Sequence, residues 1–330
     1  MSATAPPYRP PVKVAPGVHL LQVPIRIPLR YINCYLCEGP NGWTLVDTGF
    51  HDDLAEEAWG RGFAALGITP SQVRQILVTH YHPDHIGAAG WLQELTGAPV
   101  YLHEKELPVL DLFFGGRMRE QMADLKAQFC DEGMPADLVE QILIHHEHQW
   151  QRVLPFPTIT PLPTGSRFQI GTYDCEVIWT PGHSDGLAVF FAEPEGVLFA
   201  NDMLLAKITP NVSLWPNCRQ DPLEDYLESL TRVEALPVKV ALTGHRTVID
   251  NVASRCREIR EHHRERLAIV AGACQVEGGA TAWEVCQKVF EPERLTIHQV
   301  RFAMSETLAH LVYLVNRGKL QKRGNRYLPV

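Results

Sequence analysis

Short hydrophobic runs in the first part of the chain alternate with polar positions in the way typical of β-strands. Turn residues at 39–42 separate two of these runs, whereas residues 53–67 have hydrophobic positions at helical spacing and end at a glycine. Strands mixed with helices predict a layered α/β arrangement with the helices outside. The predicted strands are 18–24, 31–38, 43–49, 75–79, 100–104, 168–180, 187–193, 196–202 and 239–244, and the predicted helices are 53–67, 88–97 and 222–236.

Two other segments have helical spacing and no strand signal. Residues 105–150 are interpreted as a helical insertion, for which the role of a lid is one hypothesis. After about residue 257, three helices precede a small hairpin that turns at Gly324-Asn325, an order typical of a winged helix. We therefore predict a flexible, proline-rich N-terminus over 1–16, a main domain over 17–256 and a small winged-helix-like domain over 257–330.

Composition and charge narrow the class of protein. Hydrophobic residues make up 45% of the chain and charged residues 21%, which is ordinary for a globular protein with a sizeable core. The formal net charge of −8 disfavours a surface that attracts nucleic-acid phosphates. No apolar run is long enough to cross a bilayer and the start has no apolar signal-peptide segment, so we expect a cytoplasmic protein without membrane contact.

The eight cysteines are scattered, which favours reduced thiols over a disulfide framework. Cys34 and Cys37 form a C-x-x-C sequence inside a predicted strand. Residues three apart on a strand point to opposite faces, so these two thiols are not expected to share a metal ion or a disulfide.

The densest chemistry follows directly after the strand at 75–79. The sequence T-H-Y-H-P-D-H-I-G places three imidazoles and a carboxylate within six residues, at His80, His82, Asp84 and His85. An extended stretch points residues two apart to one side, which gives the first two histidines a common direction. The other two residues begin the next helix and can turn toward a second ion.

Three more residues of metal-binding type follow later strands, each in a loop just after a β-run. Loops at one edge of the sheets can converge on one cleft, so these side chains are expected to join the first cluster. The complete set of candidate metal ligands is His80, His82, Asp84, His85, His183, Asp202 and His245.

The order of these motifs resembles the metallo-β-lactamase superfamily. H-x-H-x-D-H after a strand is followed by a distant Gly-His, an Asp and a second Gly-His, and LVDTG around Asp47 is similar to that family's opening motif. The resemblance covers roughly residues 17–250 and implies a four-layer αββα sandwich of the α/β (α+β) class. It also implies that His80, His82 and His183 hold one metal ion, that Asp84, His85 and His245 hold a second, that Asp202 bridges both, and that Asp47 orients the site from behind.

The resemblance implies a mechanism in which two divalent ions activate a shared water to hydroxide and polarise a carbonyl or phosphoryl oxygen. In that mechanism Asp84 also holds or steers the hydroxide proton and is the candidate catalytic residue. Zinc is the default ion for histidine-rich sites, and iron and manganese also suit histidine combined with carboxylate.

Three functional hypotheses stay open. The first is a hydrolase of esters, thioesters or lactones, acting on a small molecule or on an acyl group attached to a carrier protein. The motif is similar to that of the glyoxalase II branch, although Asn201 stands where that branch usually has glycine. The second is a phosphodiesterase or endoribonuclease, because a lactamase-like domain followed by a winged helix resembles both animal endoribonucleases and fungal enzymes that release polyketide acids from carrier proteins.

The third hypothesis is a winged-helix regulator whose hydrolase domain only senses a ligand, and the complete ligand set disfavours it. The sequence does not name the substrate, choose between carbonyl and phosphodiester chemistry, identify the metal or fix the oligomeric state, a homodimer included.

Other polar clusters have plainer interpretations. The histidines in the insertion are expected to be solvated or part of a lid. The adjacent pair in the first C-terminal helix is expected to cap that helix or to pack against its neighbours. The basic hairpin is more typical of a solvated face than of a nucleic-acid site, and Tyr81, between two candidate ligands, is more typical of packing than of substrate contact. These clusters are His145, His146 and His148; His262 and His263; and Lys319, Lys322, Arg323 and Arg326.

Overall fold

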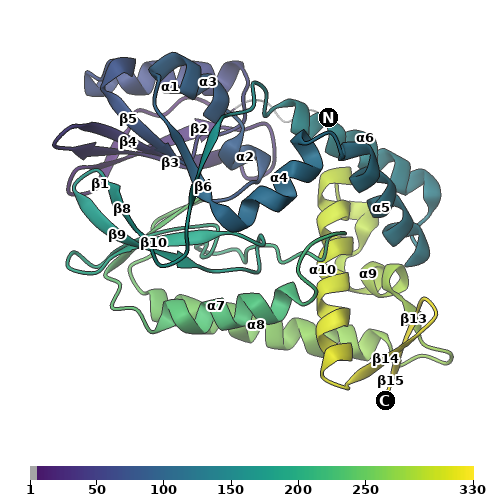
Figure 1. Cartoon of the computed structure of the whole chain (residues 1–330). Helices are drawn as coiled ribbons and strands as arrows, with labels where there is room; N and C mark the ends of the chain where they lie inside the picture. The colour runs from purple at the N-terminus through teal and green to yellow at the C-terminus, as the bar shows by residue number, and fades with distance from the viewer. Residues whose placement is uncertain (1–5) are drawn as a thin grey trace.

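Two β-sheets packed face to face form the centre of the computed structural model, which describes residues 6–330 (Figure 1). Residues 1–5 of the predicted flexible N-terminus lie outside the described residues. In spatial order, the first sheet contains β1 (Val12–Ala15), β2 (Val18–Pro24), β3 (Tyr31–Gly39), β4 (Gly42–Val46), β5 (Val73–Leu77), β6 (Val100–His103) and β7 (Ile159–Leu162). The second contains β12 (Val240–Thr243), β11 (Val197–Asn201), β10 (Ala188–Ala192), β9 (Tyr173–Trp179) and β8 (Arg167–Ile170).

Helices cover the outer face of each sheet. The helices α1 (Asp53–Leu66) and α3 (Ala89–Thr96) bury Trp59 and Leu92 against the first sheet, and α7 (Pro222–Glu234) and the start of α8 (Val252–Ala273) bury Leu230 against the second. Between the sheets, side chains such as Tyr35 and Phe199 form a third apolar core. This arrangement confirms the predicted αββα sandwich (Figure 1).

Local sequence accounts for the ends and faces of these elements. The Asp52 carboxylate accepts a hydrogen bond from the Ala55 amide at the start of α1, and Gly67 ends the helix with φ of 65°. Cys34 lies in the core under the helices and Cys37 in the core between the sheets, and both are free thiols. The expectation that they face opposite sides of one strand is confirmed.

Two of the strands that the sequence pattern missed, β1 and β7, are the edges of the first sheet, and the predicted strand 168–180 is divided into β8 and β9. The predicted flexible segment 1–16 is wrong for residues 12–15, which form β1 and pair with β2. Strand β7, at the opposite edge, contains Pro161 and is mostly exposed. An edge strand has one unpaired side, tolerates proline and is only partly buried, so its residues show weak alternation.

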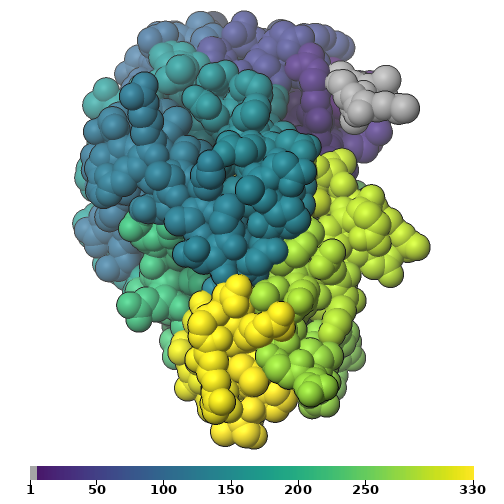
Figure 2. Space-filling view, turned by 90° about the vertical axis from the view of Figure 1, so that its right-hand side faces the viewer, coloured from purple at the N-terminus to yellow at the C-terminus, as the bar shows by residue number. Residues whose placement is uncertain are grey.

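The helical insertion and the C-terminal segment share one hydrophobic core. Leu125 and Ile142 of the insertion pack with Met304 and Leu308 near the C-terminus, and the two regions lie side by side in Figure 2. The helix α8 begins after its N-cap Asn251 and spans the predicted boundary at 257. The elements here are α4 (Leu107–Phe114), α5 (Met118–Asp131), α6 (Ala136–Gln151), α9 (Ala282–Phe290), α10 (Ile297–Asn316) and the strands β13 (Ala280–Thr281), β14 (Leu320–Arg323) and β15 (Arg326–Pro329).

The predicted C-terminal order of three helices and a hairpin is present, with β13 added to the hairpin as a third strand. Within residues 6–330, no helix is both long enough and apolar enough to span a membrane. The remaining short elements are α2 (Pro83–Ile86) and 3₁₀ turns at Pro70–Gln72, Glu104–Glu106 and Pro292–Arg294.

Candidate metal centre

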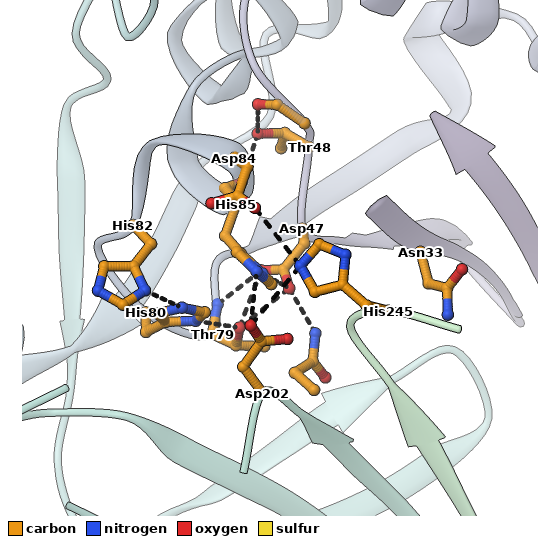
Figure 3. Close-up of polar contacts among 12 residues, drawn as sticks. Asn33, Asp47, Thr48, Thr79, His80, His82, Asp84, His85, Asp202 and His245 are labelled. Carbon is orange, nitrogen blue, oxygen red and sulfur yellow. Dashed lines mark hydrogen bonds and ion pairs between the residues drawn. The ribbon is translucent and has the colours of Figure 1, made fainter. Parts of the chain in front are cut away.

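The seven predicted ligands come together at one edge of the sandwich. Asp84 and His85 lie in the short helix α2 (Pro83–Ile86), and the other five lie in loops that follow β5, β9, β11 and β12. The six that are labelled in Figure 3 gather around one centre. The candidate ligand atoms fall into three groups, and within each group they lie within 4.8 Å of one another. These groups are His80, His82 and His183; His80, His85 and Asp202; and Asp84, His85 and His245.

Asp202 is the central carboxylate of this cluster. Its Oδ2 atom lies 3.5 Å from His85 Nε2 and 3.6 Å from the Nε2 atoms of both His183 and His245. On one side, His80 Nε2 lies 2.9 Å from His82 Nδ1. A carboxylate surrounded by imidazoles from three loops can contact more than one cation at once.

The outer nitrogen of three imidazoles is fixed by an acceptor. Nδ1 of His183 donates to the Asn211 carbonyl at 2.7 Å, and Nδ1 of His245 donates to the Tyr31 carbonyl at 2.8 Å. His85 Nδ1 lies 2.7 Å from a carboxylate oxygen of Asp47. A carbonyl only accepts, so in a neutral His183 or His245 the proton sits on Nδ1 and Nε2 presents its lone pair to the centre.

The ligand atoms that face the centre lack hydrogen-bond partners, and this shows whether the residues suit a metal ion. The Nε2 atoms of His85, His183 and His245 and the Oδ1 atom of Asp202 are buried and have no hydrogen-bond partner among the described residues. Buried polar atoms without partners are rare because each loses its hydration. Divalent ions would satisfy all of them, so the donor set fits a metal centre.

Asp47 lies behind the centre and joins three of the loops. It is fully buried, its Oδ1 accepts from the Thr79 amide at 2.8 Å, and its Oδ2 contacts His85 and the side-chain amide of Asn201. Asn201, which departs from the glycine of the glyoxalase II branch, adopts a positive φ of 41° that asparagine tolerates better than most residues. Its amide thereby binds a carboxylate that glycine would leave without this partner.

Burial and charge set the protonation of the cluster. Burial and the neighbouring imidazoles hold the pKa of His80 and of His82 well below the ordinary value. Burial lowers the pKa of His85, but the carboxylates of Asp47 and Asp202 outweigh it and raise that pKa. Burial raises the pKa of Asp84, yet the bond from His245 and the other histidines keep it below the usual range. His80 and His82 are therefore neutral imidazoles beside ionised carboxylates, the donor forms that metals bind, whereas His85 and His245, whose pKa values are raised, would release a proton when a cation binds.

A glycine next to His245 permits this close packing. A Cβ atom at Gly244 would lie 2.1 Å from the Asp202 carboxylate and 2.9 Å from the His85 ring. Any other residue at this position would push two candidate ligands apart.

A cavity of about 470 Å³ opens over the cluster. Its lining includes Tyr81 and Phe113, which both stack on Trp150, with ring centroids 5.9 Å and 3.8 Å from that of Trp150. Residues from α10 line the same cavity. The wall is therefore built by the insertion and the C-terminal helix together.

The other histidine clusters are not among the candidate ligands, although His146 lines the same cavity. His146 is buried beside Trp150 and Arg301, because α6 packs against α10. Of the two roles expected for this cluster, solvated or part of a lid, the first is wrong for this position. His148 is exposed. His263 is buried and lies 3.2 Å from His310 Nε2, in agreement with the expected packing role.

The sequence pattern gave no signal for two carboxyl groups near the centre, the buried Glu106 and the half-buried Glu306. Glu306 of α10 accepts a hydrogen bond of 2.9 Å from Asn211, whose carbonyl holds His183. Glu106 accepts a hydrogen bond from Ser184, the residue after His183. Neither carboxyl belongs to a local motif, and both reach the centre only through contacts between distant segments.

Comparison with known proteins agrees with this geometry. The family profile described as "Metallo-beta-lactamase superfamily" matches residues 27–245. The chain belongs to the metallo-beta-lactamase superfamily. A second profile, "Metallo-beta-lactamase-like, C-terminal domain", matches residues 267–327 of this metallo-hydrolase.

Solved structures and curated relatives extend the match over nearly the whole metallo-hydrolase. A metallo-beta-lactamase family protein of Thermus thermophilus, TTHA1429, is 38% identical, with 96% of this chain and 99% of that chain covered and a TM-score of 0.84. The probable metallo-hydrolase YqjP of Bacillus subtilis is 26% identical over 88% of this chain and 90% of its own length. An atrochrysone carboxyl ACP thioesterase of Aspergillus fumigatus is 25% identical over 41% of this chain and 44% of its own.

Proposed function

We propose that this metallo-hydrolase cleaves a carbonyl substrate, an ester, thioester or lactone, with two divalent ions at the candidate centre. The observation that carries the proposal is the convergence of unpartnered, buried ligand atoms on one point at the floor of the cavity. In the proposed assignment, His80, His82 and His183 would hold one ion, Asp84, His85 and His245 would hold the other, and Asp202 would be a ligand shared by the two. Bound ions would supply Lewis-acid activation of a water molecule and of the carbonyl oxygen.

Within this proposal Asp84 is the catalytic residue of the chain itself. Its carboxylate lines the cavity and one oxygen lies 3.4 Å from His245 Nε2. Because its pKa is held low by the surrounding histidines, it is ionised at neutral pH and can accept a hydrogen bond from an attacking water and steer its proton. The second carboxylate of the cluster, Asp202, is surrounded by imidazoles and is assigned to metal binding alone.

The chemistry of the wall favours an acyl substrate over a nucleic acid. Tyr81, Phe113 and Trp150 offer stacked apolar surface beside the centre. In the basic hairpin, Lys322 pairs with Glu132 at 2.5 Å and Arg326 with Glu284 at 3.3 Å, which leaves less charge for phosphates. We therefore interpret the C-terminal elements as a winged-helix-like module that serves as a cavity wall. The fungal relative named as an ACP thioesterase supports thioesters as the first class to test.

The test is a panel assay on purified protein of known metal content. The panel contains acyl thioesters, lactones, bis-p-nitrophenyl phosphate and single-stranded RNA, assayed before chelation, after it, and after return of zinc, iron or manganese. We expect turnover of thioester, ester or lactone that falls by about 10³-fold or more on metal removal and returns with one of the ions.

The matched variants are His82→Ala at the centre and His148→Ala on the exposed face of α6. Only the first should lose metal and activity. Turnover confined to the phosphodiester or RNA would replace the proposal with the nuclease alternative. Full hydrolysis by metal-free protein would overturn both hydrolase hypotheses.

A further inference from the structure

The cavity contains a buried cation without an anionic partner. Arg301, in α10, lines the cavity and is only 6% exposed. Its Nε atom has no hydrogen-bond partner among the described residues, and no carboxylate of residues 6–330 lies within 4.0 Å of its guanidinium nitrogens. A buried charge without a counter-charge in contact with it is unfavourable, so such a group requires an explanation.

The neighbours of Arg301 are aromatic rings and a neutral imidazole. Its guanidinium carbon lies 5.2 Å from the ring centroid of Trp215 and 4.5 Å from that of Phe302. Its Nη1 contacts Nδ1 of His146, whose pKa is held well below the ordinary range by burial and by the arginine. These contacts fix the plane of the guanidinium but supply no negative charge.

Arg301 and the metal centre open into the same cavity. Asp84, His183 and Asp202 line it together with Arg301, and Trp150 and Leu125 add apolar surface to the lining. The cavity therefore offers the metal centre, a cation and apolar surface to one ligand. A guanidinium presents parallel N–H groups that match the two oxygens of a carboxylate.

We propose that Arg301 binds a carboxylate of the substrate, so that the preferred substrate is an ester, thioester or lactone whose acyl part carries a second, free carboxyl group. This assignment rests on the proposed hydrolase function. A monoanion fits better than a phosphate dianion, because Arg301 is one cation and the lining also contains the acidic residues Asp185 and Glu306. The metal centre acts on one carbonyl, and Arg301 holds the carboxylate of the same molecule.

The kinetic test uses substrates that differ only in charge. They are N-acetylcysteamine thioesters of succinate, adipate and suberate, each with its distal carboxyl either free or methylated. We expect the metal-loaded wild type to prefer the free acid at one chain length by about 10-fold or more in kcat/KM. Arg301→Met should lose about 10–100-fold on that acid and less than about 3-fold on its methyl ester.

Two further variants separate recognition from folding. Arg301→Lys keeps the positive charge but lacks the parallel N–H groups of the guanidinium. Its kcat/KM on the free acid should fall less than that of Arg301→Met. Arg294→Met removes an arginine whose side chain is 77% exposed and should change neither substrate. Equal losses on acid and ester, or no preference in the wild type, would overturn the assignment.

A binding measurement distinguishes failure of this inference from failure of the proposed function. Calorimetric titration of the metal-loaded protein with the free diacid and its monomethyl ester needs no turnover. Both ligands can contact a metal ion with one carboxylate, but only the diacid can also reach Arg301. If the wild type binds the diacid about 10-fold tighter and Arg301→Met does not, the anion site stands even where no thioester is cleaved. Equal affinity of both ligands would refute it.

Discussion

The floor and the wall of the cavity are built by different physical means. The floor consists of short loops at the ends of β5, β9, β11 and β12, and the sandwich core holds these strand ends in place. The wall consists of helices from the insertion and of α10, which share a separate core beside the sandwich. The sheets therefore fix the positions of the candidate metal ligands, whereas helices from distant segments determine the shape and charge of the cavity that would receive the substrate.

The two regions are joined at identifiable contacts. The loop that holds His183 through the Asn211 carbonyl is itself bound to α10, by the side chain of Glu306 and by a 3.0 Å backbone bond from Leu214 to Ser305. On the other side, Glu106 lies between β6 and α4 and accepts from Ser184. These contacts make the comparison testable, because each can be weakened without touching a candidate ligand.

The largest effect is expected for Asp47→Asn, which alters the floor alone. The change removes the negative charge opposite His85 and disturbs the bonds from Thr79 and Asn201, so metal affinity should fall by about 10–100-fold. Competition with a chromophoric chelator measures this directly.

The control for this variant is Asp53→Asn, whose carboxylate is exposed. Diacid binding through Arg301 should keep its dependence on the distal carboxyl in Asp47→Asn protein reloaded with metal. Unchanged metal affinity would show that Asp47 does not orient the centre.

A smaller effect is expected for Glu306→Ala, which cuts the contact between wall and floor. Loss of the hydrogen bond to Asn211 frees the carbonyl that holds His183, so metal affinity should fall by about 10-fold. Glu306→Gln retains an oxygen that accepts from Asn211 and should recover most of the affinity. The readout is metal affinity together with the thermal midpoint; a loss of stability with wild-type affinity in both variants would mean that the wall does not position the floor.

The smallest effect is a change in stability with pH at Glu106. Burial raises the pKa of this carboxyl to about 8, above the 4.5 of a free glutamate. Between these values the folded protein retains a proton that the unfolded chain has lost, so the free energy of unfolding falls as the pH rises through this window. Glu106→Gln removes this dependence.

Thermal melts of metal-free protein at pH 6 and pH 8.5 test this prediction. Relative to wild type, Glu106→Gln should lose less thermal stability between the two values, by roughly 3–8 °C. The exposed neighbour Glu104 provides the control, since Glu104→Gln should follow the wild type. Parallel curves for wild type and Glu106→Gln would contradict the raised pKa.

Local sequence was sufficient to predict the structure wherever a few neighbouring residues decide it. The interior strands, the glycine that ends α1 and the cluster at His80–His85 depend on contacts within a few positions or on repeated alternation. The edge strands β1 and β7 escaped prediction because half of their pairing is absent and their burial is low. The buried state of His146 escaped it because that burial comes from α10, more than a hundred residues along the chain.

By itself, the sequence determined the layered fold, the order of strands that carry the candidate ligands and the kind of chemistry those ligands support. Only the tertiary structure decided which buried atoms lack partners, that the insertion and the C-terminal helix form one wall, and that Arg301 stands in the cavity without a counter-charge. The physical reason is range: strands and ligand motifs follow from periodicity along the chain, whereas burial of a charge depends on every segment that packs around it.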